Sequence, residues 1–88
     1  MKVYVAFNPN TFNSIICIAE SYKAAVKHIF DFHWINPKDE ILIENQMTTL
    51  EEFFGEDCVD MMVEEWDMTD FNEFWNGDFR IEEMEVIK

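Results

Sequence analysis

Residues that interrupt regular structure are rare in this sequence, because its 88 residues include only two glycines and two prolines. Helices and strands joined by short connections are therefore expected. Cysteine is equally rare, and Cys17 and Cys58 are too few for the disulfide framework of a small secreted domain. No signal-peptide pattern follows Met1, and the apolar run 15–19 is far shorter than the roughly 20 residues of a membrane span. We therefore expect a cytoplasmic protein without a membrane partner.

Basic residues are scarce, since six Lys and Arg stand against 19 Asp and Glu and give a net charge of −13. This balance argues against direct binding to nucleic acid and against polybasic attachment to a membrane surface. At 49% hydrophobic and 16% aromatic residues, the chain is nevertheless too apolar to be disordered. Its length and composition predict a single folded domain over residues 1–88.

Motifs that carry catalysis are also missing. The sequence has neither a Gly-rich phosphate loop nor a Gly-x-Ser-x-Gly nucleophile turn. Cys17 lies in the middle of a predicted strand, where a small buried hydrophobe is the simpler interpretation. Cys58 follows a predicted helix cap, which can lower a thiol pKa, but no His or Lys stands beside it in the sequence. We expect no enzymatic activity and no cofactor.

The first half of the chain predicts a hairpin followed by a helix. Residues 2–7 and 14–19 are β-rich and are separated by turn-forming residues, so they predict two antiparallel strands. Ser21 is a predicted N-cap, and apolar residues follow it at helical spacing up to Phe30. We expect this helix to end near His33–Trp34, before the Asn36-Pro37 pair.

The second half predicts three short helices and a closing strand. Residues 40–44 favour a short strand or an extended connection. The pattern Thr48–Glu51 predicts a capped helix that Gly55 ends, and Asp57 is the predicted cap of the next one. Three further features are expected: an inward apolar stripe at Val59, Met62, Val63 and Trp66, a third helix capped by Thr69 or Asp70, and a strand over 79–87 with a bulge near Glu82-Glu83.

Together these elements predict an α+β fold: a small antiparallel sheet of three or four strands, one packed helix, and an acidic helical insertion before the last strand. The excess charge lies in that insertion. Residues 1–43 are neutral overall, whereas ten of the 23 residues from Glu51 to Glu73 are acidic and none is basic. Like charges at helical spacing destabilise a fold, so this concentration favours a surface that binds a partner. The predicted partner-binding residues are Glu51, Glu52, Phe53, Glu56, Asp57, Asp60, Glu64, Glu65, Asp67, Asp70 and Glu73.

The spacing of these acids suggests mimicry of nucleic acid. One acid occurs per about 2.3 residues, or about 3.5 Å along an uninterrupted helix, close to the 3.4 Å between phosphates of a DNA strand. Lys and Arg in a partner's groove would be attracted before contact. Phe53 and Phe54 are adjacent and cannot both point inward, so one of them is a candidate exposed anchor. The expected partner is therefore a basic, nucleic-acid-binding protein.

The acidic tract, from Glu51-Glu52-Phe53-Phe54-Gly55-Glu56-Asp57 through Val63-Glu64-Glu65-Trp66-Asp67, resembles the small acidic anti-defence proteins of phages and mobile elements. These are anti-CRISPR proteins and anti-restriction DNA mimics. The resemblance implies an inhibitor in a bacterial host cell that binds a nuclease, with a CRISPR effector nuclease or its complex as the leading target, and blocks loading of DNA or RNA.

Two alternatives remain open at this stage. One is a small regulatory or structural protein, a homodimer whose apolar strands pair across a two-fold axis. The other is a metal-binding protein that uses His28, Asp31 and His33, of which His28 and Asp31 share one helix face. For these residues a simpler interpretation exists, with His28 as a surface residue and His33 as a C-terminal helix cap.

Overall fold

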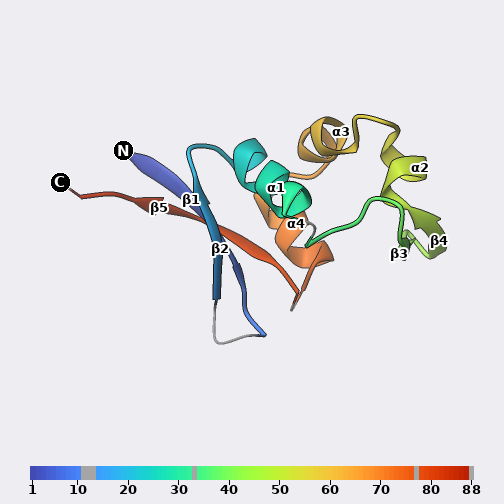
Figure 1. Cartoon of the computed structure of the whole chain (residues 1–88), viewed down its shortest axis with the longest axis horizontal. Coiled ribbons are helices and arrows are strands. Elements are labelled where there is room, and N and C mark those ends of the chain that lie inside the picture. The colour runs from blue at the N-terminus through green and yellow to red at the C-terminus, as the bar shows by residue number, and fades with distance from the viewer. Residues whose placement is uncertain (11–13, 33, 77, 88) are drawn as a thin grey trace.

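A central hairpin, a helical layer and a closing strand make up the structure, a computed structural model that describes residues 1–10, 14–32, 34–76 and 78–87 (Figure 1). In chain order the elements are β1 (Lys2–Asn8), β2 (Ser14–Ala19), α1 (Tyr22–Asp31), β3 (Glu40–Ile43), β4 (Gln46–Thr49), α2 (Leu50–Phe54), α3 (Cys58–Glu65), α4 (Met68–Phe74) and β5 (Arg80–Glu85). This arrangement confirms the predicted α+β fold.

β1 is the middle strand of an antiparallel sheet with the order β2-β1-β5. The pairing of β1 with β2 is irregular between Ala6 and Phe7, whereas the pairing of β1 with β5 runs without a break. The bulge predicted near Glu82-Glu83 is therefore wrong. The pattern was misleading because β5 carries an apolar residue on each face: Ile81 is fully buried, and Met84 is exposed on the other side.

The helices lie on one face of this sheet. α1 packs on β1 and β2, and α4 packs on β5, so the sheet has a second covering helix besides the predicted one. α3 packs on α1, and α2 packs on α3. Between the layers lie side chains with no exposed surface: Ala6, Val26, Ile29, Phe71 and Ile81. Burial of an Ile or Phe side chain stabilises the fold by about 1.5–3 kcal/mol, so these few residues hold the layers together.

α1 begins where the sequence predicts and ends slightly earlier. Ser21 is its N-cap, and the Ser21 hydroxyl accepts a hydrogen bond from the N–H of Ala24 at 3.1 Å. The helix ends at Asp31 rather than near His33–Trp34. The N–H of Trp34 bonds to the carbonyl of Ile29 at 3.1 Å, a 6→1 hydrogen bond across the end of the helix. The chain thus leaves the helix before it reaches Asn36-Pro37.

Residues 40–49 form a second, two-stranded sheet in which β3 pairs with β4. The strand over Glu40–Ile43 was one of two predicted options, but β4 was not predicted. Ile43 pairs with Gln46, so only Glu44 and Asn45 form the turn, and both have positive φ values of 50° and 68°. A two-residue turn with this geometry matches the right-handed twist of the strands. Asn adopts it readily, whereas Glu seldom does.

The caps of the three short helices differ partly from those predicted. Thr49, not Thr48, caps α2 and accepts a hydrogen bond from the N–H of Glu52 at 3.1 Å. Gly55 ends α2 as predicted, with φ 91° and ψ −171°. Asp57 precedes α3, but its side chain makes no capping hydrogen bond.

The prediction of Thr69 or Asp70 as the cap of α4 is wrong. Asp67 holds that position, and its Oδ1 accepts from the N–H of Asp70 at 2.9 Å. The negative charge of Asp67 at the N-terminus of α4 also interacts favourably with the positive end of the helix dipole. The predicted α3 stripe is partly buried: Met62 has no exposed surface, whereas Val59, Val63 and Trp66 are half-buried.

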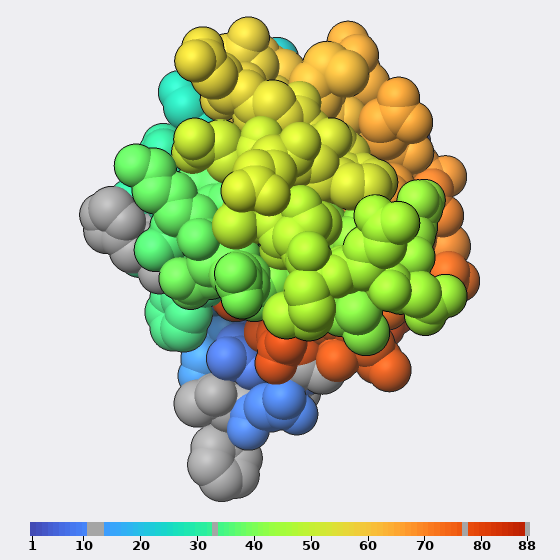
Figure 2. All heavy atoms as spheres, turned by 90° about the vertical axis from the view of Figure 1, so that its right-hand side faces the viewer, coloured from blue at the N-terminus to red at the C-terminus, as the bar shows by residue number. Residues whose placement is uncertain are grey.

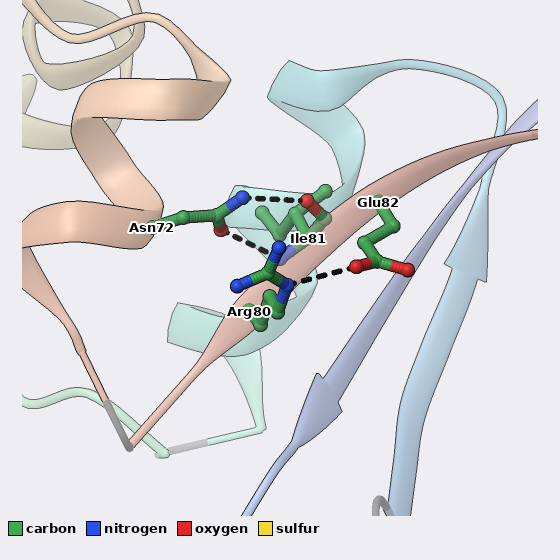
Figure 3. A network of polar contacts seen from close by, with 4 residues as sticks. All are labelled: Asn72, Arg80, Ile81 and Glu82. Carbon is green, nitrogen blue, oxygen red and sulfur yellow. Dashed lines mark hydrogen bonds and ion pairs between the residues drawn. The ribbon is translucent and has the colours of Figure 1, made fainter.

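Asn72 connects α4 to the free edge of β5 (Figure 3). Its Nδ2 donates to the carbonyl of Ile81 at 2.9 Å, and its Oδ1 accepts from the N–H of Ile81 at 2.8 Å. On the same strand, Nε of Arg80 donates to Oε1 of Glu82 at 2.8 Å.

Within the described residues, no helix has the length and apolar character that crossing a membrane requires.

Candidate functional site

The acidic surface is carried by α2, α3, α4 and the turns between them. Each of the ten acids from Glu51 to Glu73 is exposed. Glu51, Glu52 and Phe53 belong to α2, Glu56 and Asp57 to the α2–α3 connection, Asp60, Glu64 and Glu65 to α3, Asp67 to the α4 cap, and Asp70 and Glu73 to α4. Phe53 is 41% exposed and Phe54 is buried, so one ring of the pair does face solvent, as predicted.

Not all of these carboxylates lack a cation of their own. Nζ of Lys23 on α1 lies 2.8 Å from Oδ1 of Asp60 on α3, and this hydrogen bond and charge raise the pKa of Lys23. Glu64 adds a further attraction to the same ammonium. The sequence hid this contact because the partners come from different halves of the chain. Among the described residues, Asp60 is the one acid of the ten in an ion pair.

The acids of the sheet are arranged differently. Glu82 pairs with Arg80 at 2.8 Å, Glu83 pairs with Lys2 at 3.0 Å, and Glu85 lies 3.5 Å from the terminal amine of Met1. All three pairs are exposed and contribute little to stability. They do, however, engage Lys2 and Arg80 on β1 and β5, so neither of those cations is positioned to neutralise the acidic surface.

A chain of aromatic rings lies beneath this surface. Phe53 contacts Phe54 at a centroid distance of 4.8 Å, and Phe54 contacts Trp66 at 5.1 Å. Trp66 then contacts Phe74 at 4.5 Å, and Phe74 contacts Trp75 at 4.8 Å. Edge-to-face and tilted ring pairs of this kind add about 0.5–1.5 kcal/mol each beyond their buried area. The rings therefore fix α2 and α4 relative to each other, and with them the carboxylates that they carry.

Trp66 separates two grooves at this end of the molecule. The larger has a volume of about 460 Å³ and is lined by Ile43, Glu44, Trp66, Asp70, Glu73 and Phe74. The smaller has about 250 Å³ and is lined by Glu44, Phe53, Phe54, Met61, Glu65 and Trp66. Figure 2 looks onto this end, where β3, β4 and α2 lie side by side at the surface. Each groove thus combines aromatic rings with carboxylates, a lining that suits a Lys or Arg side chain.

Glu44 is the one acid of these grooves that the sequence did not predict as a site residue. It lines both of them, and it takes its place because the β3–β4 turn holds it at positive φ. The sequence signal for this turn was weak, because Asn45 favours a turn whereas Glu44 is a residue that seldom adopts positive φ. Glu44 lies outside the dense acidic tract, so a search by charge density alone passes over it.

Tyr22 fixes the junction between α3 and α4 to the first helix. Its hydroxyl donates to the carbonyl of Trp66 at 2.8 Å and lies 3.3 Å from the carbonyl of Asp67. Burial raises the pKa of Tyr22 well above its usual value, and the charges of Asp67 and Asp70 raise it further. The phenol stays neutral at physiological pH and remains a hydrogen-bond donor.

Of the three residues of the alternative metal site, His33 lies outside the described residues. Of the other two members, His28 and Asp31 are both exposed, and the ring of His28 stacks on Phe32 at a centroid distance of 5.6 Å. Across the residues that the structure describes, no group of three His, Cys, Asp or Glu side chains is placed to hold a metal ion.

The two cysteines lie in environments that disfavour a thiolate. Burial raises the pKa of Cys58, and this effect exceeds the lowering by the backbone at the start of α3. Burial likewise raises the pKa of Cys17. A nucleophilic cysteine requires the opposite shift.

Comparison of the chain with protein-family models, with curated proteins and with solved structures finds no match. The acidic surface and its two grooves are therefore the features of this chain from which a function can be inferred.

Proposed function

We propose that this protein is a non-enzymatic inhibitor that binds a basic, nucleic-acid-binding protein of bacterial defence, a CRISPR effector nuclease or its complex, and blocks the loading of DNA or RNA. The observation that carries the proposal is the imbalance of charge. Within the described chain, nine of the ten acids from Glu51 to Glu73 form no ion pair, whereas the acids of β5 are paired. A folded domain that bears such self-repulsion gains stability when another protein supplies the cations.

The surface acts by competing with phosphate. A groove that holds nucleic acid is lined with Lys and Arg, and these side chains exchange one polyanion for another. The field of the acidic half steers the two proteins together, so association is fast and sensitive to salt. The acids lie on short helices joined by packed rings, and little ordering entropy is lost when they bind.

The two grooves add aromatic rings to the carboxylates of the acidic surface. An Arg side chain that enters beside Trp66 meets a ring face and carboxylates at the same time, which phosphate cannot offer. Phe53 stands at the rim of the smaller groove as an apolar anchor. The grooves therefore favour a protein partner over simple counter-ions.

The first experiment identifies the partner. The immobilised protein is incubated with a bacterial lysate treated with nuclease, at about 0.15 M and at about 0.5 M salt, because a charge-driven complex weakens over that range. Captured proteins are identified by mass. A nucleic-acid-binding defence protein that is captured at low salt and released at high salt is the expected result. Capture that is indifferent to salt contradicts the proposal.

The second experiment uses two variants of equal net charge. Glu44→Lys, Glu65→Lys and Glu73→Lys reverse three groove acids that make no ion pair in the described chain. The control reverses three exposed acids elsewhere, Glu20→Lys, Asp31→Lys and Asp39→Lys. The groove variant should block DNA binding by the captured effector more than tenfold less well, and the control should stay within about threefold of wild type. Equal losses in both variants would show that net charge alone, and not this surface, determines binding.

A further inference from the structure

One face of the three-stranded sheet is apolar and uncovered. Strands alternate their side chains between two faces. On β1, Tyr4 and Ala6 point toward α1 and the core, so Val3, Val5 and Phe7 point the other way. Ile15 and Ile18 of β2 and Met84 of β5 stand beside these three. We call this set, Val3, Val5, Phe7, Ile15, Ile18 and Met84, the outer face.

The outer face lies apart from the main buried cluster, although Val5 at its centre is itself only 7% exposed. None of its six residues belongs to the buried cluster or packs against it. Ile15 is 64% exposed and Ile18 is 61% exposed, and the six residues line a broad hollow of about 780 Å³. Single exposed hydrophobic residues are normal on a protein, but a contiguous patch marks a surface that another molecule covers.

The charges around this face define its occupant. Arg80, Glu82 and Glu85 border the hollow. Arg80 pairs with Glu82 at 2.8 Å and Glu85 lies 3.5 Å from the terminal amine of Met1, so each carboxylate at this border has a cation beside it. A basic partner of the kind proposed for the acidic surface finds no unpaired carboxylate on it among Arg80, Glu82 and their neighbours on β1. A partner that is itself apolar and carries charges of both signs at its border suits this face, and a second copy of the chain meets both conditions.

The acidic half permits such a pairing because it lies on the other side of the sheet. α1 and α4 cover the inner face, and α3 and α2 lie beyond α1 (Figure 1). Two copies that meet outer face to outer face keep their acidic helices at opposite ends of the assembly. The acidic helices of the two copies are then separated by two sheets about 10 Å apart and by the helices that cover each sheet, which exceeds the Debye length of about 8 Å at physiological salt. Repulsion between two copies of net charge −13 therefore does not prevent this contact.

We propose that the occupant of the outer face is a second copy of this chain, packed sheet against sheet about a two-fold axis. Two twisted sheets stack about 10 Å apart with their strands within about 30° of each other, and a two-fold axis places the same patch on both sides. Arg80 and Glu82 of one copy can then exchange partners with those of the other. Three strands of six or seven residues cover only about 14 by 20 Å, so the dimer is weak and depends on concentration.

Sedimentation of the full chain over about 1 to 300 µM tests this assignment, because mass action shifts a weak dimer over such a range. Wild type should change from monomer to dimer. The double variant Ile15→Lys, Ile18→Lys should remain monomeric at every concentration. Both side chains are more than half exposed, so their replacement should leave the fold intact, which circular dichroism checks.

The matched control is Leu42→Lys, Met47→Lys. These two residues form an exposed cross-strand pair on the β3–β4 sheet, 58% and 64% exposed, far from the outer face. The control should dimerise as wild type does. Wild type that stays monomeric throughout would show that something other than a second copy covers the face. A dimer that survives the outer-face change, or is lost equally in the control, also overturns the proposal. Neither result bears on the acidic surface, which the outer-face variant leaves intact.

Discussion

Asn72 of α4 and Ile81 of β5 exchange two hydrogen bonds of 2.9 and 2.8 Å, and the Asn72 amide thereby takes the place of a neighbouring strand. β5 is an edge strand, and Ile81 turns both its N–H and its carbonyl away from β1 (Figure 3). A side-chain amide is the only short group that both donates and accepts in this geometry. The contact satisfies the free edge of β5 at Ile81 and ties the last acidic helix to the sheet.

Asn72→Asp should therefore destabilise the protein by about 1–3 kcal/mol, although the side chain keeps its shape. The carboxylate still accepts from the N–H of Ile81, but it cannot donate to the carbonyl and is held against that oxygen. Urea unfolding followed by circular dichroism measures the change. Asn76→Asp, the same substitution at an exposed residue, should stay within about 0.5 kcal/mol of wild type. Similar losses at both positions would mean that the hydrogen bonds to Ile81 contribute nothing specific.

Gly55→Ala should destabilise the protein by about 1–3 kcal/mol through the backbone alone. Gly55 has φ 91° and ψ −171°, a region that is essentially restricted to glycine. An added Cβ would meet no atom within 4 Å, so no steric clash contributes. Glu56→Ala, one residue later at an exposed position, is the control and should be nearly neutral. Thermal unfolding of both variants gives the comparison, and a neutral Gly55→Ala would contradict the strained geometry.

The fold was predictable where local chemistry decides it. A few neighbouring residues are enough to predict three of its features: the turn between β1 and β2, the Ser21 cap and the glycine that ends α2. The β3–β4 hairpin was less accessible because Gln46–Thr49 has no apolar alternation. On β5, Ile81 lies on the buried face of the sheet and Met84 on the opposite, exposed face. If only one face is assumed to be apolar, this spacing wrongly predicts a bulge.

The sequence predicted which acidic residues are exposed at the site, but it did not predict the grooves between them. Exposure of the acids follows from their spacing opposite an apolar stripe, which is local information. The ion pair of Lys23 with Asp60 and the grooves beside Trp66 join residues from α1, α2, α3, α4 and the β3–β4 turn. Such contacts between distant segments leave no periodic trace in a sequence.

Tyr22→Phe should reduce the free energy of unfolding by about 0.5–1.5 kcal/mol at neutral pH. The change removes the donor to the carbonyl of Trp66 and leaves that half-buried oxygen without this bond. Tyr4→Phe serves as the control, because no hydrogen bond from the Tyr4 hydroxyl occurs within the described part of the chain. A larger loss for Tyr4→Phe would contradict the role given to Tyr22 at the α3–α4 junction.

The difference in stability between wild type and Tyr22→Phe should depend on pH in the alkaline range. The pKa of Tyr22 is raised on folding, whereas a tyrosine in the unfolded chain ionises near pH 10. A raised pKa gives stability that is complete below the unfolded value and declines as pH rises from about 10 toward the folded value. The advantage of wild type over Tyr22→Phe should therefore be constant up to about pH 9 and shrink above pH 10. Urea unfolding at several pH values measures it, and an advantage that grows with pH would reverse the sign and refute the assignment.

The grooves beside Trp66 should prefer arginine to lysine. Guanidinium stacks on an aromatic face while it bonds to carboxylates, whereas ammonium acts mainly as a point charge. A hexa-arginine peptide should therefore bind at least about threefold more tightly than hexa-lysine at equal charge, as measured by calorimetry at low salt. Trp66→Leu retains every carboxylate and removes the ring shared by both grooves, so it should reduce this preference while leaving hexa-lysine binding nearly unchanged. If Trp66→Leu remains folded and retains the full preference, the rings are only core and the surface recognises its partner by charge alone.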